Sequence, residues 1–144
     1  MSISLRFYRD NWIKNYNNSY KEKDSLFCME LICLLSSGQG TWAQVSGLMK
    51  YGEWEKIILV GDEFAKSFTH DKKFEFVKVD LNKKLGDLKE DFISKLKGKF
   101  EEMEVACSIA SGNGKEHMAL VSALLNLPVG VRFCALTKNG VSYL

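Results

Sequence analysis

The stretch VACSIASGNGKEHMALVSALL, residues 105–125, has the pattern of a strand followed by a turn and a helix. It begins with an apolar run, VACSIA (105–110), which has the length of a buried strand. The small polar residues and glycines of SGNGK (111–115) follow, and a mostly apolar segment then continues to about Leu127, before Pro128. Strand, glycine-rich turn and helix in this order indicate one unit of an α/β protein.

The same alternation of strand and helix recurs along the chain. Other apolar runs occupy residues 26–35, 56–60, 74–81 and 129–136. The clearest helix is expected from Leu85 to about Phe100, where apolar side chains share one face. Nearly continuous apolar strands separated by helices are typical of a parallel sheet. We therefore predict an α/β fold, a Rossmann-like doubly wound, mainly parallel sheet of five to six strands with helices on both faces.

Turn residues predict where several of these elements begin and end. Thr41 is expected to cap the helix after the first strand, and Gly52 is expected to stop that helix. Pro128 is expected to close the helix that precedes the fifth strand. KNG (138–140) predicts a turn, after which VSYL (141–144) is either a short return strand or a tail.

The first 24 residues lie outside this alternation, so we divide the chain into an N-terminal aromatic arm (1–24) and a Rossmann-like ligand-binding domain (25–144). Trp12, Tyr16 and Tyr20 are spaced by four, as on one face of a helix. The arm either packs on its own domain or forms a contact with a second copy or another partner.

Composition excludes several classes of protein. Of 144 residues, 46% are hydrophobic and 26% charged, as in an ordinary globular domain, and the net charge of +2 is too small to indicate binding to duplex nucleic acid. No apolar run reaches the roughly 18 residues that span a membrane. The four cysteines lie in apolar runs without a Cys-x-x-Cys pair, so we expect reduced, buried thiols in a cytoplasmic protein. With His70 and His117 as the only histidines, we expect no metal site and no cofactor.

Two loops carry the strongest indication of function. Open α/β sheets bind ligands beyond the carboxyl ends of their strands, at the point where the strand order reverses. In the order 3-2-1-4-5 that point lies between the first and fourth strands. The loops after these strands are SSGQGT (36–41) and SGNGK (111–115), the two stretches of the chain richest in glycine and hydroxyl groups. We therefore predict that they meet at one crevice.

Such loops suit an anion. A helix start leaves backbone N–H groups unpaired, and glycine lets a phosphate approach them closely. Lys115 would add a full positive charge, although a solvated side chain is an equal alternative. Glu116 is expected to be a partner of the helix dipole, and Asp62 and Glu63 either edge the pocket or start a short helix. The alternative for both loops is that they are plain structural turns.

The two loops and their flanking strands resemble CRISPR-associated Rossmann-fold (CARF) domains. The resemblance rests on an apolar strand ending in SSGQGT, on SIASGNGKEHMAL (108–120), and on VGVRFCALTKNGV (129–141) as the last core strand and terminal turn. It covers roughly residues 26–144. Named phosphate motifs are absent, because Ile109 and Glu116 break a Walker A pattern and no G-x-G-x-x-G or G-x-S-x-G sequence is present.

The resemblance implies a homodimer whose paired loops bind a cyclic oligoadenylate second messenger of CRISPR defence. It implies a stand-alone sensor or a metal-independent ring nuclease, in which Lys115 stabilises charge and Ser36 or Ser37 orients the ribose. Alternatives are a small hydrolase or transferase acting on another phosphorylated metabolite, and an interaction module without a ligand. Carried over by position, the ligand-binding residues are Ser36, Ser37, Gly38, Thr41, Ser111, Gly112, Asn113, Gly114 and Lys115.

Overall fold

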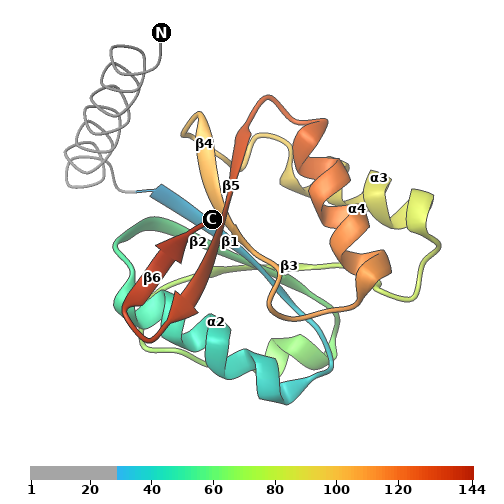
Figure 1. Cartoon of the computed structure of the whole chain (residues 1–144). Helices are drawn as coiled ribbons and strands as arrows, with labels where there is room; N and C mark the ends of the chain where they lie inside the picture. The colour runs from blue at the N-terminus through green and yellow to red at the C-terminus, as the bar shows by residue number, and fades with distance from the viewer. Residues whose placement is uncertain (1–28) are drawn as a thin grey trace, which may run out of the picture.

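Strand β1 (Met29–Leu35) lies in the middle of a six-stranded sheet and is almost completely buried (Figure 1). The structure is a computed structural model, and it describes residues 29–144 except for the side chain of Gln39. The strand order is β3-β2-β1-β4-β5-β6. The first five strands pair in parallel, and β6 is antiparallel to β5. The prediction of an α/β fold with a mainly parallel sheet of five to six strands is therefore confirmed.

Three α-helices and one short 3₁₀ helix connect the strands within the described residues. The elements after β1 are α2 (Gln39–Tyr51), β2 (Trp54–Gly61), η1 (Phe64–Ser67), β3 (Glu75–Lys78), α3 (Leu85–Leu96), β4 (Glu104–Ser108), α4 (Gly114–Leu125), β5 (Gly130–Thr137) and β6 (Gly140–Tyr143). None of these helices is long and apolar enough to cross a membrane. The predicted N-terminal arm, residues 1–24, lies outside the described residues.

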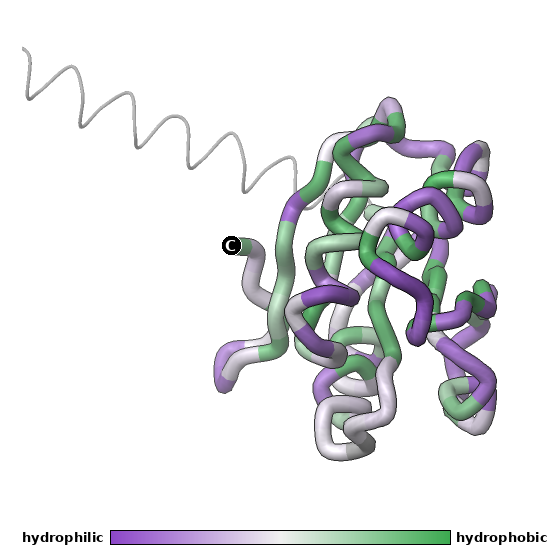
Figure 2. The backbone as a smooth tube through the Cα atoms, turned by 90° about the vertical axis from the view of Figure 1, so that its right-hand side faces the viewer, coloured by the Kyte–Doolittle hydropathy of each residue, from purple (hydrophilic) through white to green (hydrophobic). Residues whose placement is uncertain are grey.

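The buried side chains form two hydrophobic clusters that divide β1 residue by residue. Ile32 and Leu34 belong to a cluster that also contains the buried residues of α3 and α4. Leu31, Cys33 and Leu35 belong to a second cluster, which contains the buried residues of α2. Figure 2 shows where apolar and hydrophilic residues lie along the backbone, with apolar residues along the inner strands and hydrophilic residues in many of the outer loops. This alternation explains why residues 31–35 of β1 are all apolar, since a strand with one face exposed would have polar residues at every second position.

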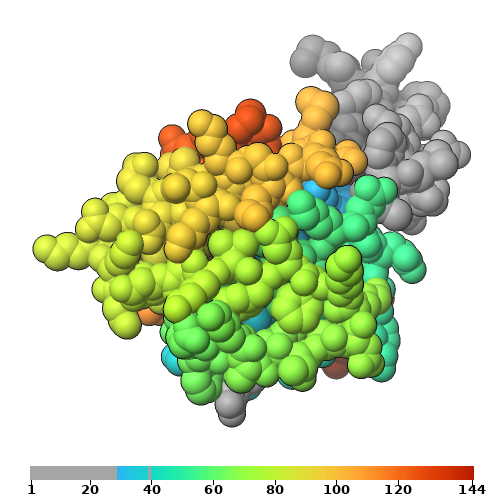
Figure 3. Space-filling view, turned by 180° about the vertical axis from the view of Figure 1, so that it is seen from behind, coloured from blue at the N-terminus to red at the C-terminus, as the bar shows by residue number. Residues whose placement is uncertain are grey.

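Helix α3 packs against α4 and carries the clearest amphipathic pattern of the chain. Leu88, Phe92 and Leu96 are its buried residues. The predicted extension of this helix to Phe100 is wrong, because α3 ends at Leu96 and Gly98 adopts a φ of 77°, a left-handed conformation that favours glycine. Seen from behind, the surface is formed mainly by the middle of the chain, from η1 through α3 (Figure 3).

Of the other predicted helix and strand boundaries, some are confirmed and some are wrong. Gly52 ends α2 as predicted, and β6 confirms the return strand after the KNG turn. The short helix η1 follows β2 with Glu63 as its N-cap, and the side chain of Asp62, one residue earlier, accepts a hydrogen bond from the amide of Ala65. Thr41 does not cap α2, since the helix begins at Gln39 with Gly38 as its N-cap. The α4 helix ends at Leu125, two residues earlier than expected.

A buried carboxylate fixes the chain at the amino end of β4. Glu30 is 2% exposed, and its two oxygens accept hydrogen bonds from the backbone amides of Glu101 and Glu102 at 3.1 to 3.2 Å. Because Glu30 lies opposite Val105 in the β1–β4 pair, these bonds hold the segment that enters β4 against β1. The carboxylate thus stabilises the pairing of the two central strands.

We expect Glu30→Gln to lower the free energy of unfolding by about 1–3 kcal/mol, because an amide group replaces one of the accepting oxygens with a donor that faces other donors. Urea denaturation followed by circular dichroism measures the effect. Glu102→Gln is the matched control, since that side chain is exposed and should change stability little. Equal stability of the two variants would contradict the role of Glu30.

Three cysteines are buried and free, as predicted for them: Cys33, Cys107 and Cys134. Burial raises the pKa of Cys107 and Cys134 to about 12, and it raises the pKa of Cys33 well above its ordinary value. Cys28 lies outside the described residues. These three side chains therefore remain neutral thiols at physiological pH.

Since the thiolate is the reactive form, we expect Cys33, Cys107 and Cys134 to resist alkylation by iodoacetamide at pH 8 in the folded protein. All three should react after denaturation in guanidinium. Peptide mapping by mass spectrometry measures the modification at each cysteine. Rapid labelling of Cys107 in the native state would show that the core is open to solvent.

Candidate functional site

The two predicted loops meet at the carboxyl ends of β1 and β4. These strands are neighbours in the sheet, with Cys33 opposite Ser108, so the chain leaves both at the same edge. The backbone amide of Ser36 donates a hydrogen bond of 2.9 Å to the hydroxyl of Ser111, 75 positions away in the sequence. The prediction that the two loops come together is confirmed. The strand order 3-2-1-4-5, from which it was derived, is also confirmed.

Glu116 joins the two loops by a second set of hydrogen bonds. Glu116 is 3% exposed, and its carboxylate accepts a bond of 2.7 Å from the Ser36 hydroxyl and one of 3.3 Å from the amide of Asn113. The amide of Glu116 in turn donates to the side-chain oxygen of Asn113 at 3.0 Å. This reciprocal pair is a capping box, so the predicted role of Glu116 at the helix start is confirmed.

Two ring side chains and one glycine hold the backbone of these loops. The Trp42 indole N–H donates to the carbonyl of Ser36 at 2.8 Å, and its rings contact the exposed Phe64 and the buried Phe68. His117 Nε2 donates to the carbonyl of Ser111 at 2.8 Å, because a carbonyl oxygen can only accept. Gly112 has a φ of 105°, and a Cβ there would lie 2.5 Å from Leu34 Cδ2. The loops are therefore positioned from within the protein.

Backbone donors at the two helix starts remain unpaired. Within residues 29–144, no acceptor contacts the amide of Gly40 in α2, or the amides of Gly114 and Lys115 in α4. A Cβ added at Gly40 or Gly114 would meet no atom within 4 Å, so neither glycine is required by internal packing. Two helix N-termini thus offer free N–H groups, each with its partial positive charge, at one edge of the sheet.

The polar side chains proposed for the site have different partners. The hydroxyls of Ser36 and Ser111 form hydrogen bonds between the two loops, and the side-chain oxygen of Asn113 caps α4. Thr41 Oγ1 donates to the carbonyl of Gly38 at 2.7 Å. The ammonium group of Lys115 donates to the carbonyls of Leu81 and Lys83, at 2.7 and 2.9 Å. Ser37 is exposed and has no partner among the described residues.

The charged residues after β2 and β3 form ion pairs with one another. Glu63 pairs with Lys78 and Lys66, and hydrogen bonds from these lysines lower the pKa of its carboxyl group. Lys83 lies 2.6 Å from Asp91, which raises the pKa of the ammonium group. Within the part of the chain that the structure describes, no group of three His, Cys, Asp or Glu side chains could hold a metal ion.

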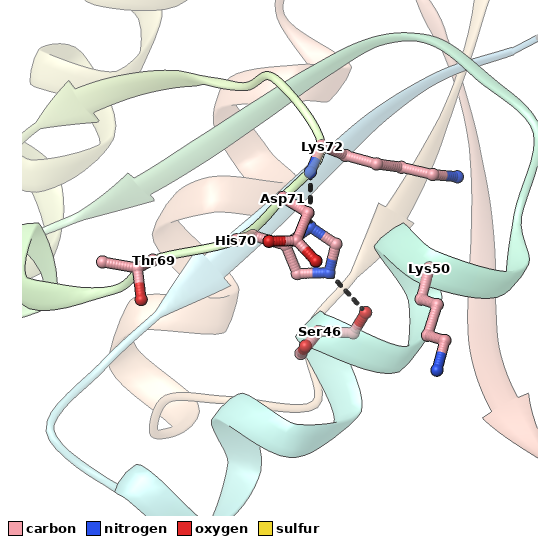
Figure 4. Close-up of a pocket in the computed structure, with 6 residues that line it drawn as sticks. All are labelled: Ser46, Lys50, Thr69, His70, Asp71 and Lys72. Carbon is pink, nitrogen blue, oxygen red and sulfur yellow. Dashed lines mark hydrogen bonds between the residues drawn. The ribbon is translucent and has the colours of Figure 1, made fainter.

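Two hollows open on the surface of the described residues, and neither is lined by residues 36–41 or 111–115. A basic hollow of about 510 Å³ lies between α2 and the segment before β3 (Figure 4). Its lining residues are Ser46, Lys50, Thr69, His70, Asp71 and Lys72. The two nitrogens of His70 are both used, since Nδ1 accepts from the amide of Lys72 and Nε2 donates to the carbonyl of Ser46. This ring therefore links α2 to the following loop.

An apolar hollow of about 410 Å³ lies at the carboxyl end of β4. It is lined by Ile109, Ala110, Phe133, Cys134, Ala135 and Leu144. Ile109 and Ala110 come directly before the loop 111–115, so this hollow adjoins one of the two predicted loops. The basic hollow contains no residue of either loop.

The contact of Glu116 with Ser36 was not predicted. The sequence NGKE (113–116) fits the pattern of a capping box, in which Asn or Ser is followed three residues later by Glu. That pattern could have placed the carboxylate at the helix start. It could not have placed Ser36 beside it, because the two residues are 80 positions apart and meet only through the sheet.

Comparison of the chain with models of protein families, with curated proteins and with solved structures found no match.

We expect Ser111→Ala to lower the free energy of unfolding by about 1–3 kcal/mol, since the Ser36 amide loses its acceptor. Ser37→Ala is the matched control on the same loops and should leave stability unchanged, because that hydroxyl has no partner among the described residues. Thermal unfolding of both variants measures the difference. Unchanged stability of Ser111→Ala would mean that the two loops are held together by other contacts.

Proposed function

We propose that this protein is a homodimeric nucleotide-binding domain that senses a cyclic oligoadenylate second messenger of CRISPR defence in the cytoplasm. The observation that carries the proposal is the meeting of two glycine-rich helix starts at one edge of the sheet, with the amides of Gly40, Gly114 and Lys115 unpaired among the described residues. Unpaired amides at helix N-termini favour a phosphate. The cyclic oligoadenylate follows from the resemblance of SSGQGT and SIASGNGKEHMAL to CARF loops.

A Rossmann-like, doubly wound arrangement with helices on both faces of the sheet is part of the proposal. Two observations support it. The strand order reverses between β1 and β4, and alternate residues of β1 join either the cluster with α2 or the cluster with α3 and α4. Since alternate strand residues point to opposite faces, each face of the sheet would be covered by its own helices.

The contacts of the proposed ligand-binding residues favour recognition by backbone more than by side chains. Ser36 and Ser111 hold the two loops together and the Asn113 side chain caps α4, whereas Ser37, Gly38, Gly112 and Gly114 are exposed. A ligand would therefore meet the amides of the helix starts and the Ser37 hydroxyl first. Lys115 would contact a phosphate only after leaving the carbonyls of Leu81 and Lys83.

Cleavage of the bound ring is a further part of the proposal. The ribose 2′-oxygen would attack the adjacent phosphorus, the bond from phosphorus to the 5′-oxygen would break, and the 2′ proton would pass to that leaving oxygen. The products would be a 2′,3′-cyclic phosphate and a 5′-hydroxyl, and no metal is needed. Ser37 would orient the ribose. Ser36 would act through its hydrogen bond to Glu116, and Lys115 would stabilise the developing charge.

A second candidate is a small hydrolase or transferase that acts on another phosphorylated metabolite. The hydrogen bond of 2.7 Å from the Ser36 hydroxyl to Glu116 favours it, because a carboxylate that accepts a hydroxyl proton can activate that oxygen as a nucleophile. This candidate predicts a monomeric protein that turns over a mononucleotide or a sugar phosphate. The third candidate, an interaction module, predicts no binding of any phosphorylated compound.

The test is calorimetric titration of the purified protein with a panel of cyclic oligoadenylates, followed by chromatography of the mixtures. We expect saturable binding by a dimer, and linear products if the ring is cleaved. Sedimentation analysis establishes the dimer. A folded dimer that binds no member of the panel would refute the proposal.

Gly114→Ala tests the site itself. The added methyl group meets no protein atom within 4 Å, but it stands beside the unpaired amide. We expect it to weaken ligand binding by about tenfold, equivalent to about 1.4 kcal/mol, with stability unchanged or slightly higher. Gly86→Ala in the first turn of α3 is the matched control, because its Cβ also meets open space. Equal affinities of the two variants would place the ligand elsewhere.

A further inference from the structure

The apolar hollow lined by Ile109 and Phe133 exists because β5 extends further than its neighbour β4 at their carboxyl ends. Strand β4 ends at Ser108, whereas β5 continues past Phe133, the residue opposite Cys107, as far as Thr137. The chain turns away after β4 toward the loop 111–115, so the last residues of β5 have no strand on that side. The hollow of about 410 Å³ occupies the space left there.

The lining of this hollow contains no charged side chain. Ile109 and Phe133 are half-buried, and each packs against the hydrophobic cluster that contains α4. Ala110 and Ala135 have short side chains and leave the space open, while Leu144 closes one side and is 82% exposed. Cys134 also lines the hollow, but its side chain belongs to the other hydrophobic cluster, with α2, where burial raises the pKa of the thiol to about 12. An apolar hollow of this kind favours a flat aromatic group over an ion.

The position of the hollow links it to the unpaired amides of α4. Ala110 lines the hollow and stands four residues before Gly114, so their Cα atoms are separated by at most about 14 Å. A phosphate at the start of α4 and an aromatic ring in the hollow are therefore within reach of one small molecule. The basic hollow beside His70 has no such connection, because no residue of either loop lines it.

We infer that the apolar hollow between the β4–α4 loop and β5 binds the nucleobase of a ligand whose phosphate lies on the amides of Gly114 and Lys115. The inference rests on the proposed nucleotide-binding function and specifies where the base is held. Phe133 and Ile109 supply apolar contact to the ring, and the short side chains of Ala110 and Ala135 leave the room that the ring needs. The ligand is thus recognised by backbone at one end and by apolar surface at the other.

Two matched probes separate the base from the phosphate. Adenosine 5′-monophosphate and ribose 5-phosphate differ only in the base, so the ratio of their dissociation constants measures the contribution of the hollow. For the unaltered protein we expect adenosine 5′-monophosphate to bind about tenfold more tightly or better. Its binding should also show the more negative heat-capacity change, because the base buries apolar surface. Equal dissociation constants and equal heat-capacity changes would overturn the inference.

Ala135→Leu fills the hollow without adding charge, and Ala110→Leu fills it from the exposed loop side if the first variant folds poorly. We expect either change to remove the preference for adenosine 5′-monophosphate and to leave the affinity for ribose 5-phosphate as it was. Ser94→Leu, at an exposed position of α3, is the control for added apolar bulk. An unchanged preference in a folded variant would refute the base site alone. Failure of the unaltered protein to bind either probe would also overturn the base site, whereas the proposed function is refuted only if a folded dimer binds no cyclic oligoadenylate of the panel.

Discussion

The parallel pairing of β1 with β4 is the constraint on which the rest of the structure depends. Both strands lie inside the sheet, and their buried residues belong to both hydrophobic clusters. Because the strands run in the same direction, the helices that follow them, α2 and α4, both begin at one edge. Two sets of unpaired amides and two helix dipoles are thereby placed together, which no local segment of the chain could achieve. At the opposite edge, Glu30 binds the backbone that enters β4 and stabilises the same pair.

Glu116 determines which polar groups at this edge of the sheet form hydrogen bonds within the protein. A buried carboxylate is costly unless donors surround it, and this one accepts hydrogen bonds from the Ser36 hydroxyl and the Asn113 amide at the start of a helix. The hydroxyls of Ser36 and Ser111 consequently bind across the two loops, and the Asn113 side chain caps α4. The groups that remain for a partner molecule are outward backbone donors, the Ser37 hydroxyl and the apolar hollow beside the second loop. A site of this composition is suited to a molecule that is anionic at one end and flat and apolar at another.

The errors in the predicted elements have local causes. The apolar pattern of α3 continues to Phe100. The helix nevertheless ends earlier, because Gly98 adopts a left-handed backbone conformation that cannot continue a right-handed helix. Thr41 is a good capping residue by type, yet Gly38 takes the N-cap position and Thr41 lies inside the first turn, where its hydroxyl returns to the Gly38 carbonyl. In both cases the hydrophobic period identified the element, and backbone conformation set its limits. No sequence pattern predicts the partners of the Lys115 ammonium group, because the carbonyls of Leu81 and Lys83 belong to a different βα unit.

The amino-acid sequence by itself determined the alternation of strands and helices, the parallel character of the sheet and the glycine-rich composition of the two loops, because each depends on hydrophobic period or on residue type, which are local properties. Only the tertiary structure decided which polar groups in those loops form hydrogen bonds within the protein and which remain available to a ligand. Ser36, Ser111 and Glu116 are ordinary polar residues until β1 and β4 bring them within hydrogen-bonding distance, and the apolar hollow arises from the unequal lengths of β4 and β5. Contacts between residues 75 and 80 positions apart depend on how the whole chain packs, and that information is absent from any single stretch of it.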